Sequence, residues 1–164
     1  MAAQLEPLGE YPGVMKYGYY KNIGVCVWLG QATRHSVNSV HEAVRTLLAR
    51  SSELHSFIHV INSGVPLPDA GGRSGMVELM KRYEARTACA AIVIGGTGFW
   101  AGGMRSAVTS LRLLAPRSFE YRLHGSTREI VPWLAQEHSR RSGVSVSQAE
   151  LAELVQQIEV WQKP

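Results

Sequence analysis

Short apolar runs separated by turn residues dominate the first two thirds of the chain. Strands are expected where these runs are rich in β-branched and aromatic residues. The expected strands cover residues 17–20, 23–29, 54–61, 87–94 and 119–123. Only Lys21 and Asn22 separate the first two, which predicts a β-hairpin. The third and fourth are apolar on both faces, which is typical of parallel strands covered by helices on both sides.

Apolar residues recur at helical spacing between and after these runs. The expected helices cover residues 36–50, 76–83 and 104–114, followed by two helices that close the chain. Ser126 and Glu129 have capping-box spacing, although Pro132 would kink this helix or move its start. Ser147 and Glu150 form a second capping box, which predicts a helix over residues 147–161 with one apolar stripe.

The element order is β-β-α-β-α-β-α-β-α-α, which predicts a single α/β domain. We expect a mostly parallel five-stranded sheet flanked by helices on both faces, with an extra C-terminal helix. The predicted core includes Ile58, Val60, Ile92 and Val93. The predicted segments are an irregular lead-in at 1–14, the α/β domain at 15–137, a polar linker at 138–146 and the extra helix at 147–164. The apolar stripe of that helix must be buried, and we favour a homodimer formed through it.

Composition narrows the class of protein. The chain has 164 residues and 45% hydrophobic residues, but its apolar runs are too short for a membrane span. The N-terminus does not resemble a secretory signal. Cys26 and Cys89 lie in apolar strands, which indicates buried free thiols and a cytoplasmic location. The net charge is +4, but the arginines are scattered, so a nucleic-acid partner is not expected.

No complete catalytic constellation is present. His41 and Glu42 begin like a zinc-protease motif, but Arg45 stands where the second histidine should be. The six histidines are spread singly, so no metal site is expected. Asp69 is the only aspartate in the chain. We therefore predict that the protein is not an enzyme and needs no cofactor.

One glycine-rich segment is compatible with nucleotide chemistry. Gly96, Gly98 and Ala101 match G-x-G-x-x-A between a strand and a helix, with Glu120 at a downstream strand. Two βα units precede this segment, however, and Phe99 and Trp100 are bulky where a pyrophosphate must approach. A flexible turn or a small-anion contact is the alternative.

Four segments carry a resemblance to a known family. They are FIHVINSG at 57–64, GGRSGMVELM at 71–80, AAIVIGG at 90–96 and PWLAQ at 132–136. Over residues 15–137 the chain resembles the STAS domain of bacterial anti-sigma-factor antagonists and sulfate-transporter tails. It is most similar to STAS-like (SEC14-like) bacterial proteins of unknown function. The resemblance implies a protein-binding module of bacterial signalling.

The resemblance also points to one serine. In the signalling antagonists, a serine in an Asp-Ser-Ser-Gly-like motif at a helix start is phosphorylated by a partner kinase. Ser74 occupies the matching place, although Gly72 replaces the Asp and Arg73 the first Ser. A phosphoryl group there would be favoured by the helix dipole and by Arg73. The alternative is that Ser74 caps the second helix.

Two loops, 62–75 and 95–103, therefore hold the candidate partner or ligand residues. These residues are Asn62, Asp69, Arg73, Ser74, Gly96, Gly98, Phe99 and Trp100. The first hypothesis is a regulatory module that binds another protein, a regulator or kinase. The second is a small-molecule or lipid-binding module with an apolar pocket between the loops, walled by Met76, Phe99, Trp100 and Met104. A nucleotide-dependent enzyme is the third.

Overall fold

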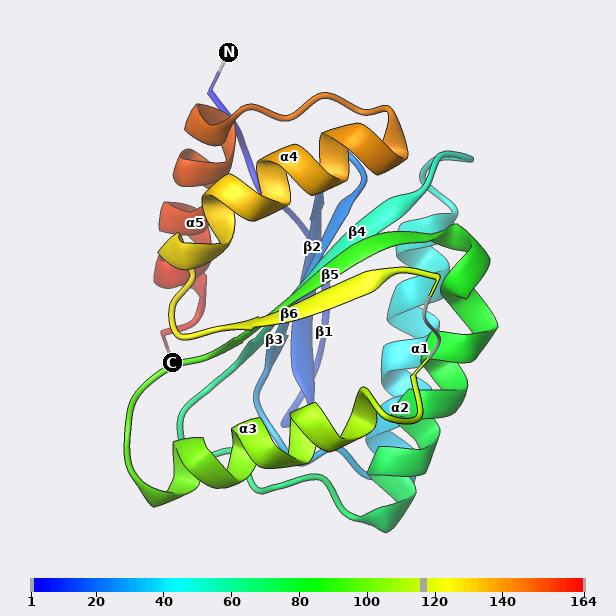
Figure 1. Ribbon diagram of the computed structural model, residues 1–164, viewed down its shortest axis with the longest axis vertical. Helices are drawn as coiled ribbons and strands as arrows, with labels where there is room; N and C mark the ends of the chain where they lie inside the picture. Colours follow the sequence, from blue (N-terminus) through cyan, green and yellow to red (C-terminus); the bar gives the residue numbers. More distant parts are fainter. Residues whose placement is uncertain (1, 116–117, 164) are drawn as a thin grey trace.

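Six strands lie in chain order across one sheet in the computed structural model, which describes residues 2–115 and 118–163 (Figure 1). The strands are β1 (Glu6–Tyr11), β2 (Met15–Tyr20), β3 (Ile23–Trp28), β4 (His55–Ile61), β5 (Thr87–Ile94) and β6 (Glu120–His124). The pairs β1–β2 and β2–β3 are antiparallel, and the three pairs from β3 to β6 are parallel. The predicted α/β class and mostly parallel sheet are confirmed, but the sheet has six strands rather than five.

The additional strand is β1, which lies where an irregular lead-in was expected. It pairs only with β2 and forms one edge of the sheet. Pro7 and Gly9 interrupt its sequence pattern, and the register shifts between them. An edge strand tolerates proline because one side of its backbone has no partner strand. The lead-in assignment is therefore wrong for residues 6–11.

The turn between β2 and β3 is the predicted hairpin. Lys21 and Asn22 have φ angles of 42° and 62°, as a two-residue turn of the I′ type requires. Asparagine tolerates this region better than most residues, and the Asn22 side chain accepts a hydrogen bond from the Tyr19 hydroxyl.

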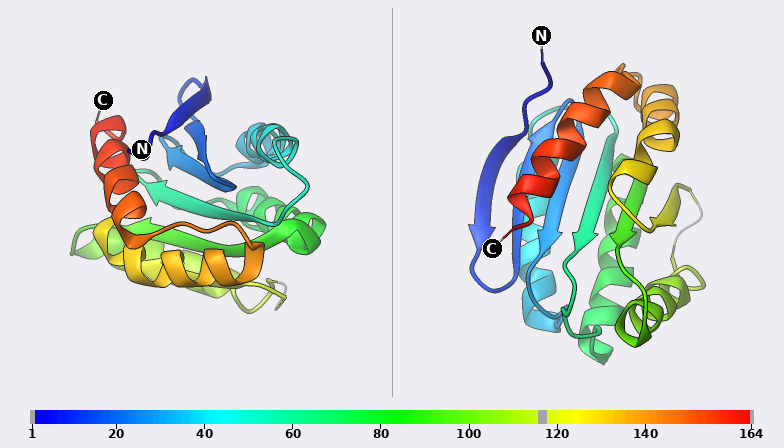
Figure 2. Two further views of the ribbon diagram at one scale, coloured as in Figure 1. Left: turned by 90° about the horizontal axis from the view of Figure 1, so that it is seen from above. Right: turned by 90° about the vertical axis from the view of Figure 1, so that its left-hand side faces the viewer.

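The strand order decides where the first three helices lie. These are α1 (Arg34–Leu48), α2 (Ala70–Tyr83) and α3 (Phe99–Leu111). They connect successive parallel neighbours, so right-handed crossovers place all three on one face of the sheet. The opposite face is covered by α4 (Val131–Ser142) and α5 (Gln148–Trp161). In the right-hand view of Figure 2, α5 lies in front of the sheet and α1 behind it, and helices on both faces are confirmed.

Because of glycines in their first turns, α2 and α3 were predicted to start later than they do. Both begin before the predicted residues 76 and 104, and each contains a Gly-Gly pair in its first turns. Gly72 is required by packing, because a Cβ there would lie 1.9 Å from the carbonyl oxygen of Ala32. The N-terminus of α2 can therefore approach the segment after β3 only through a residue without a side chain.

Of the two effects expected of Pro132, a kink or a displaced helix start, the structure shows the displaced start. Glu129 accepts a hydrogen bond from the Gly125 amide, a short 3₁₀ turn covers 128–130, and α4 begins at Val131 with Pro132 in its first turn. The capping box expected at Ser126 is not made. The helix then continues to Ser142, so the predicted linker at 138–146 is wrong for its first five residues.

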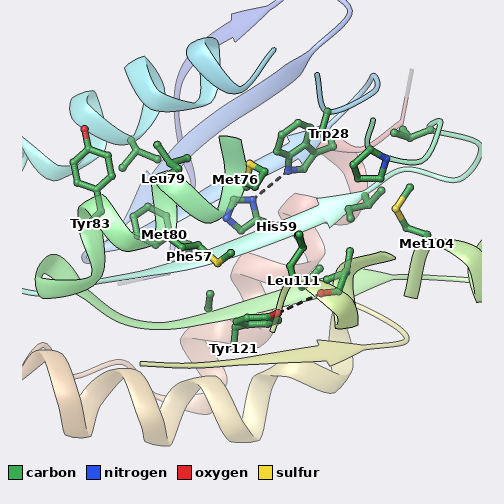
Figure 3. Close-up of a pocket in the computed structure, with 18 of the residues that line it drawn as sticks. Trp28, Phe57, His59, Met76, Leu79, Met80, Tyr83, Met104, Leu111 and Tyr121 are labelled. Carbon is green, nitrogen blue, oxygen red and sulfur yellow. Dashed lines mark hydrogen bonds between the residues drawn. The ribbon is translucent and has the colours of Figure 1, made fainter. Parts of the chain in front are cut away.

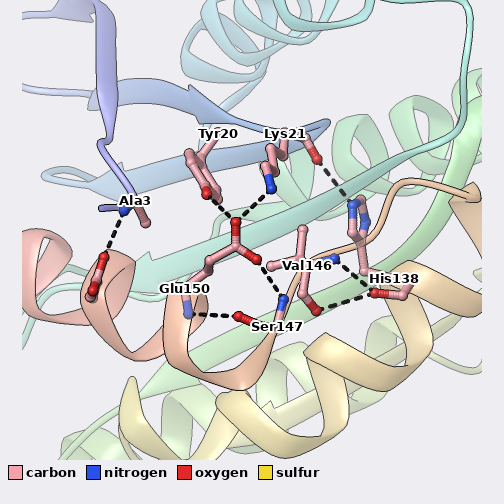
Figure 4. Close-up of polar contacts among 9 residues, drawn as sticks. Ala3, Tyr20, Lys21, His138, Val146, Ser147 and Glu150 are labelled. Atoms are coloured by element: carbon pink, nitrogen blue, oxygen red, sulfur yellow. Dashed lines mark hydrogen bonds and ion pairs between the residues drawn. The ribbon is translucent and has the colours of Figure 1, made fainter. Parts of the chain in front are cut away.

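The last helix is part of the domain. The Ser147–Glu150 capping box is confirmed, and the stripe of Leu151, Leu154, Val155 and Ile158 is buried in the same cluster as β3 and β4. Glu150 also accepts hydrogen bonds from Tyr20 and Lys21 of the hairpin (Figure 4). The hydrogen bonds from Lys21, Ser147 and Tyr20 lower the pKa of Glu150 to about 2.

This docking removes the reason for expecting a homodimer. The stripe of α5 is filled by the sheet of its own chain, and the amides of Ala3 and Leu5 donate to side chains of the same helix. In residues 2–115 and 118–163, no helix combines the length and the apolar character needed to cross a membrane.

Candidate ligand-binding pocket

A pocket of about 130 Å³ lies between α2, α3 and the sheet (Figure 3). Alternate residues of a strand point to the same face, so Phe57, His59 and Ile61 of β4 form part of its floor together with neighbours on β5 and β6. The walls come from both helices and from the loop after β4. The principal wall residues are Met76, Leu79, Met80, Tyr83, Met104, Val108, Leu111, Val65, Pro66 and Pro68.

The helical walls are made of adaptable side chains. Met76 and Met80 come from α2, and Met104 faces them from α3. Methionine is unbranched and polarizable, so it adapts to apolar contacts of different shapes. Met76, Leu79 and Met80 keep part of their surface accessible, although they pack against the core. The space between α2 and α3 can therefore be reached from outside.

Most polar groups of the pocket are satisfied within the protein. The Thr87 hydroxyl donates to the carbonyl of Tyr83 at 2.8 Å. The Tyr121 hydroxyl donates to the carbonyl of Val108 at 3.2 Å, and burial raises the pKa of Tyr121 to about 12. A molecule in the pocket would thus meet an almost entirely apolar surface.

His59 is the polar group at the centre of the floor. Its Nδ1 lies 3.2 Å from Nε1 of Trp28, and an indole nitrogen can only donate. Nδ1 is therefore the acceptor, and the proton of the neutral ring is on Nε2. Burial lowers the pKa of His59 to about 4, so the ring is neutral at physiological pH.

The loop after β4 closes one end of the pocket. Val65, Pro66 and Pro68 line the cavity, and three hydrogen bonds hold the loop in place. Trp100 Nε1 donates to the carbonyl of Val65 at 2.7 Å, Gln31 to that of Leu67 and Arg73 to that of Pro68. Trp100 therefore fastens this loop to α3 and is not the wall residue that was expected.

Of the other three predicted wall residues, two line the pocket and one does not. Met76 and Met104 line the pocket, whereas the side chain of Phe99 is fully exposed at the start of α3. The pocket lies deeper than predicted, between the helices that follow the two loops. Phe99 was misplaced because α3 was expected to begin at Met104, which would have left Phe99 in a loop.

The loop residues do not converge on one site. Asn62 donates to the backbone carbonyl of Gln162 and accepts from the side chain of the same residue, which follows the end of α5. Asp69 caps α2 by accepting from the Gly72 amide at 2.7 Å. Ser74 lies in the second turn of α2, so the expectation that it caps the helix is wrong. Its exposed hydroxyl donates to the Ala70 carbonyl and accepts from Arg34.

The glycine-rich segment lacks the arrangement of a dinucleotide site. Gly96 and Gly98 have φ angles of 83° and 93°, which require glycine, and Arg105 donates to the carbonyls of Ile94 and Gly96. Glu120 pairs in register with Cys89, five residues before the end of β5. At about 3.3 Å per residue, Glu120 is roughly 16 Å from the loop that it would have to serve.

A serine, a histidine and a cysteine meet on the other face of the sheet. His138 Nε2 donates to the carbonyl of Lys21, so Nδ1 accepts from Ser56, and Cys89 in turn donates to Ser56. All three side chains have no exposed surface. Burial lowers the pKa of His138 to about 4 and raises that of Cys89 to about 11. Substrate cannot reach this chain of hydrogen bonds, and its role is structural.

Sequence reasoning did not select His59 or Trp28. Both lie in apolar strands, and a lone histidine on a strand usually belongs to the core. Their contact depends on the pairing of β3 with β4, which sets Trp28 opposite Ile61 and Cys26 opposite His59. The shared parity of Phe57, His59 and Ile61 was the one available signal. No protein-family model matches the chain, and no curated protein is significantly similar to it.

Proposed function

We propose that this chain is a binding module for a small apolar molecule held in the pocket between α2, α3 and the sheet. The observation that carries the proposal is a cavity of about 130 Å³ with apolar walls, three methionines and one unused polar group. Apolar cavities of about this size can remain dry and bind molecules such as benzene.

The pocket is larger than the voids that imperfect packing leaves in a protein interior. Protein interiors contain few voids larger than a water molecule. This pocket is partly open, so part of its apolar lining meets water when no ligand is bound. A ligand that fills the pocket removes this apolar surface from water, which supports a binding role.

The methionines provide the test. Met76, Met80 and Met104 line the pocket, whereas Met15 is fully buried outside it. The chain is labelled with ¹³C at the methionine methyl groups and titrated with isopropylbenzene while NMR spectra are recorded. We expect saturable shifts of the three pocket methyls and none for Met15. Unchanged spectra up to the solubility limit, or equal shifts of Met15, would contradict the proposal.

A pair of variants controls for nonspecific effects. Ala90→Ile places a larger side chain inside the pocket, and Ser106→Ile adds the same group to the exposed outer face of α3. Ala90→Ile is expected to abolish the saturable shifts, and Ser106→Ile is expected to leave them unchanged.

A second candidate function is supported at Ser74. Its hydroxyl is exposed on α2, and the Arg34 guanidinium donates to it at 3.0 Å while also pairing with Glu78. A phosphoryl group there would meet Arg34, with Arg73 next in the chain, and would alter the charge of this surface. This candidate keeps the expectation of a cytoplasmic regulatory module that binds another protein.

Mass spectrometry of the protein purified from its native host tests the second candidate. A phosphoryl group located to Ser74, and lost in Ser74→Ala, is the expected result. Unmodified Ser74 in growing and in starved cells would reject it without affecting the pocket proposal.

A further inference from the structure

His138 and His59, whose pKa values burial lowers to about 4, differ in the contacts of one ring nitrogen. His138 and His59 both carry their proton on Nε2, because a donor occupies Nδ1 in each case. The Nε2–H of His138 is taken by the carbonyl of Lys21 at 3.0 Å. Within the part of the chain that the structure describes, the Nε2–H of His59 has no acceptor.

The unused donor faces the pocket. His59 is one of the lining residues and its ring keeps some accessible surface. Figure 3 shows the ring at the centre of the lining residues, with its other nitrogen directed to Trp28. By contrast, the hydroxyl groups of Thr87 and Tyr121 on the sheet side of the pocket donate hydrogen bonds to backbone carbonyls of the protein.

The His59 ring keeps some accessible surface, so water can reach the Nε2–H while the pocket is empty. A molecule that fills the pocket excludes this water, and a donor enclosed without an acceptor is unfavourable. The simplest partner is an acceptor on the bound molecule. The lining residues include no lysine or arginine, so a carboxylate would enter without a counterion. A neutral oxygen acceptor satisfies the donor without that desolvation cost.

We infer that the ligand is an apolar molecule with one neutral hydrogen-bond acceptor, such as a ketone, ester or ether oxygen, which lies against His59 Nε2. This inference rests on the proposed binding function and specifies its ligand class. The oxygen lies at the middle of β4, and the hydrocarbon part fills the space lined by Met76, Met80 and Met104.

Two probes of nearly the same shape test it. Acetophenone carries a carbonyl oxygen at the position where isopropylbenzene carries a second methyl group. The ¹⁵N-labelled protein is titrated with each probe, and the Nε2–H resonance of His59 is followed. Acetophenone is expected to move this proton downfield, and isopropylbenzene is expected to shift the methionine methyls while leaving the proton nearly unchanged.

Variants at His59 provide a second readout. His59→Phe removes the donor, whereas His59→Gln offers an amide oxygen to Trp28 and an amide N–H to the pocket. His59→Phe should weaken acetophenone binding roughly tenfold relative to isopropylbenzene, and His59→Gln should retain the wild-type ratio. If His59→Phe does not fold, the wild-type resonance decides.

The outcomes separate the two proposals. Failure of both probes to bind would overturn the proposed function together with this inference. If both probes bind but the His59 proton responds equally to each, or the affinity ratio is the same in all three proteins, the acceptor inference is wrong and the binding function stands.

Discussion

The two faces of the sheet are covered in different ways. On the face of α4 and α5, aliphatic side chains such as Leu134, Leu151 and Leu154 are fully buried, and His138 has both ring nitrogens satisfied. On the face of α2 and α3, methionines and aromatics surround a cavity, and His59 has one donor unused. The first face therefore supplies stability, while the second leaves room for a ligand.

This division follows from the topology. Three successive crossovers in one direction place α1, α2 and α3 on the same face, and the chain must return to cover the other. The closing helices α4 and α5 lie there, fixed by the capping box of Ser147 and Glu150 and by the hairpin contacts of Glu150. Tight packing on one face can compensate for a cavity on the other.

The largest expected difference between the faces is the loss in free energy of unfolding when a leucine is replaced by alanine. Leu154 is fully buried in the packed face, and Leu79 is partly exposed beside the cavity. Leu154→Ala should lower the free energy of unfolding by about 3–4 kcal/mol, because it creates a new cavity. Leu79→Ala should cost only about 1–2 kcal/mol, because less buried surface is lost. Urea denaturation of both variants measures this, and equal costs would remove the contrast.

Acid should weaken the fold through its buried histidines. The folded-state pKa of His138 is about 4 against an ordinary value of 6.5, so the unfolded chain binds the proton first. The stabilisation is complete above pH 6.5 and is lost as the pH falls to about 4. The loss from His138 is about 3 kcal/mol, and His59 adds to it in the same pH range.

Urea denaturation from pH 7.5 to 4 checks this. His138→Gln should flatten the pH dependence, although it is less stable at neutral pH. His35→Gln serves as the control, because His35 is exposed and its loss should leave the slope unchanged. A wild-type protein with constant stability between pH 6.5 and 4 would show that neither histidine is held neutral.

A smaller difference in stability is expected between substitutions at Asp69, the N-cap of α2, and at Ser74. Asp69 accepts the Gly72 amide, whereas Ser74 lies one turn inside the helix with an exposed side chain. Asp69→Ala should cost about 1 kcal/mol of stability. Ser74→Ala should change stability by less than about 0.5 kcal/mol, because exposed substitutions usually do so little. A larger loss for Ser74→Ala in thermal unfolding would restore the capping role to the serine.

Sequence patterns correctly predicted the elements whose signals lie within a short stretch of the chain. Residues 87–94 and the capping box at Ser147 appear as expected because continuous apolar character and cap spacing are local signals. The edge strand β1 was missed because Pro7 and Gly9 break its alternation. The starts of α2 and α3 were missed because glycines needed for close approach lower helix propensity.

The candidate site depended on longer-range information. Met76 and Met104 could be selected because they begin predicted helices next to flexible loops. His59 and Trp28 could not, since their contact follows from the register of β3 against β4. Of the four predicted core residues, Ile58, Val60 and Val93 are buried, while Ile92 faces the pocket and is only partly buried.

Adjacent alanines on β5 allow the most direct test of the contrast between the faces. Ala90 lines the cavity, and Ala91 is fully buried in the packed face. Measurement of the free energy of unfolding for Ala90→Ile and Ala91→Ile compares the same added atoms in the same strand. Ala91→Ile is expected to lose about 1–3 kcal/mol of stability through overpacking, whereas Ala90→Ile is expected to be neutral or stabilising because it fills empty space. Equal destabilisation by the two substitutions would contradict the existence of a usable pocket.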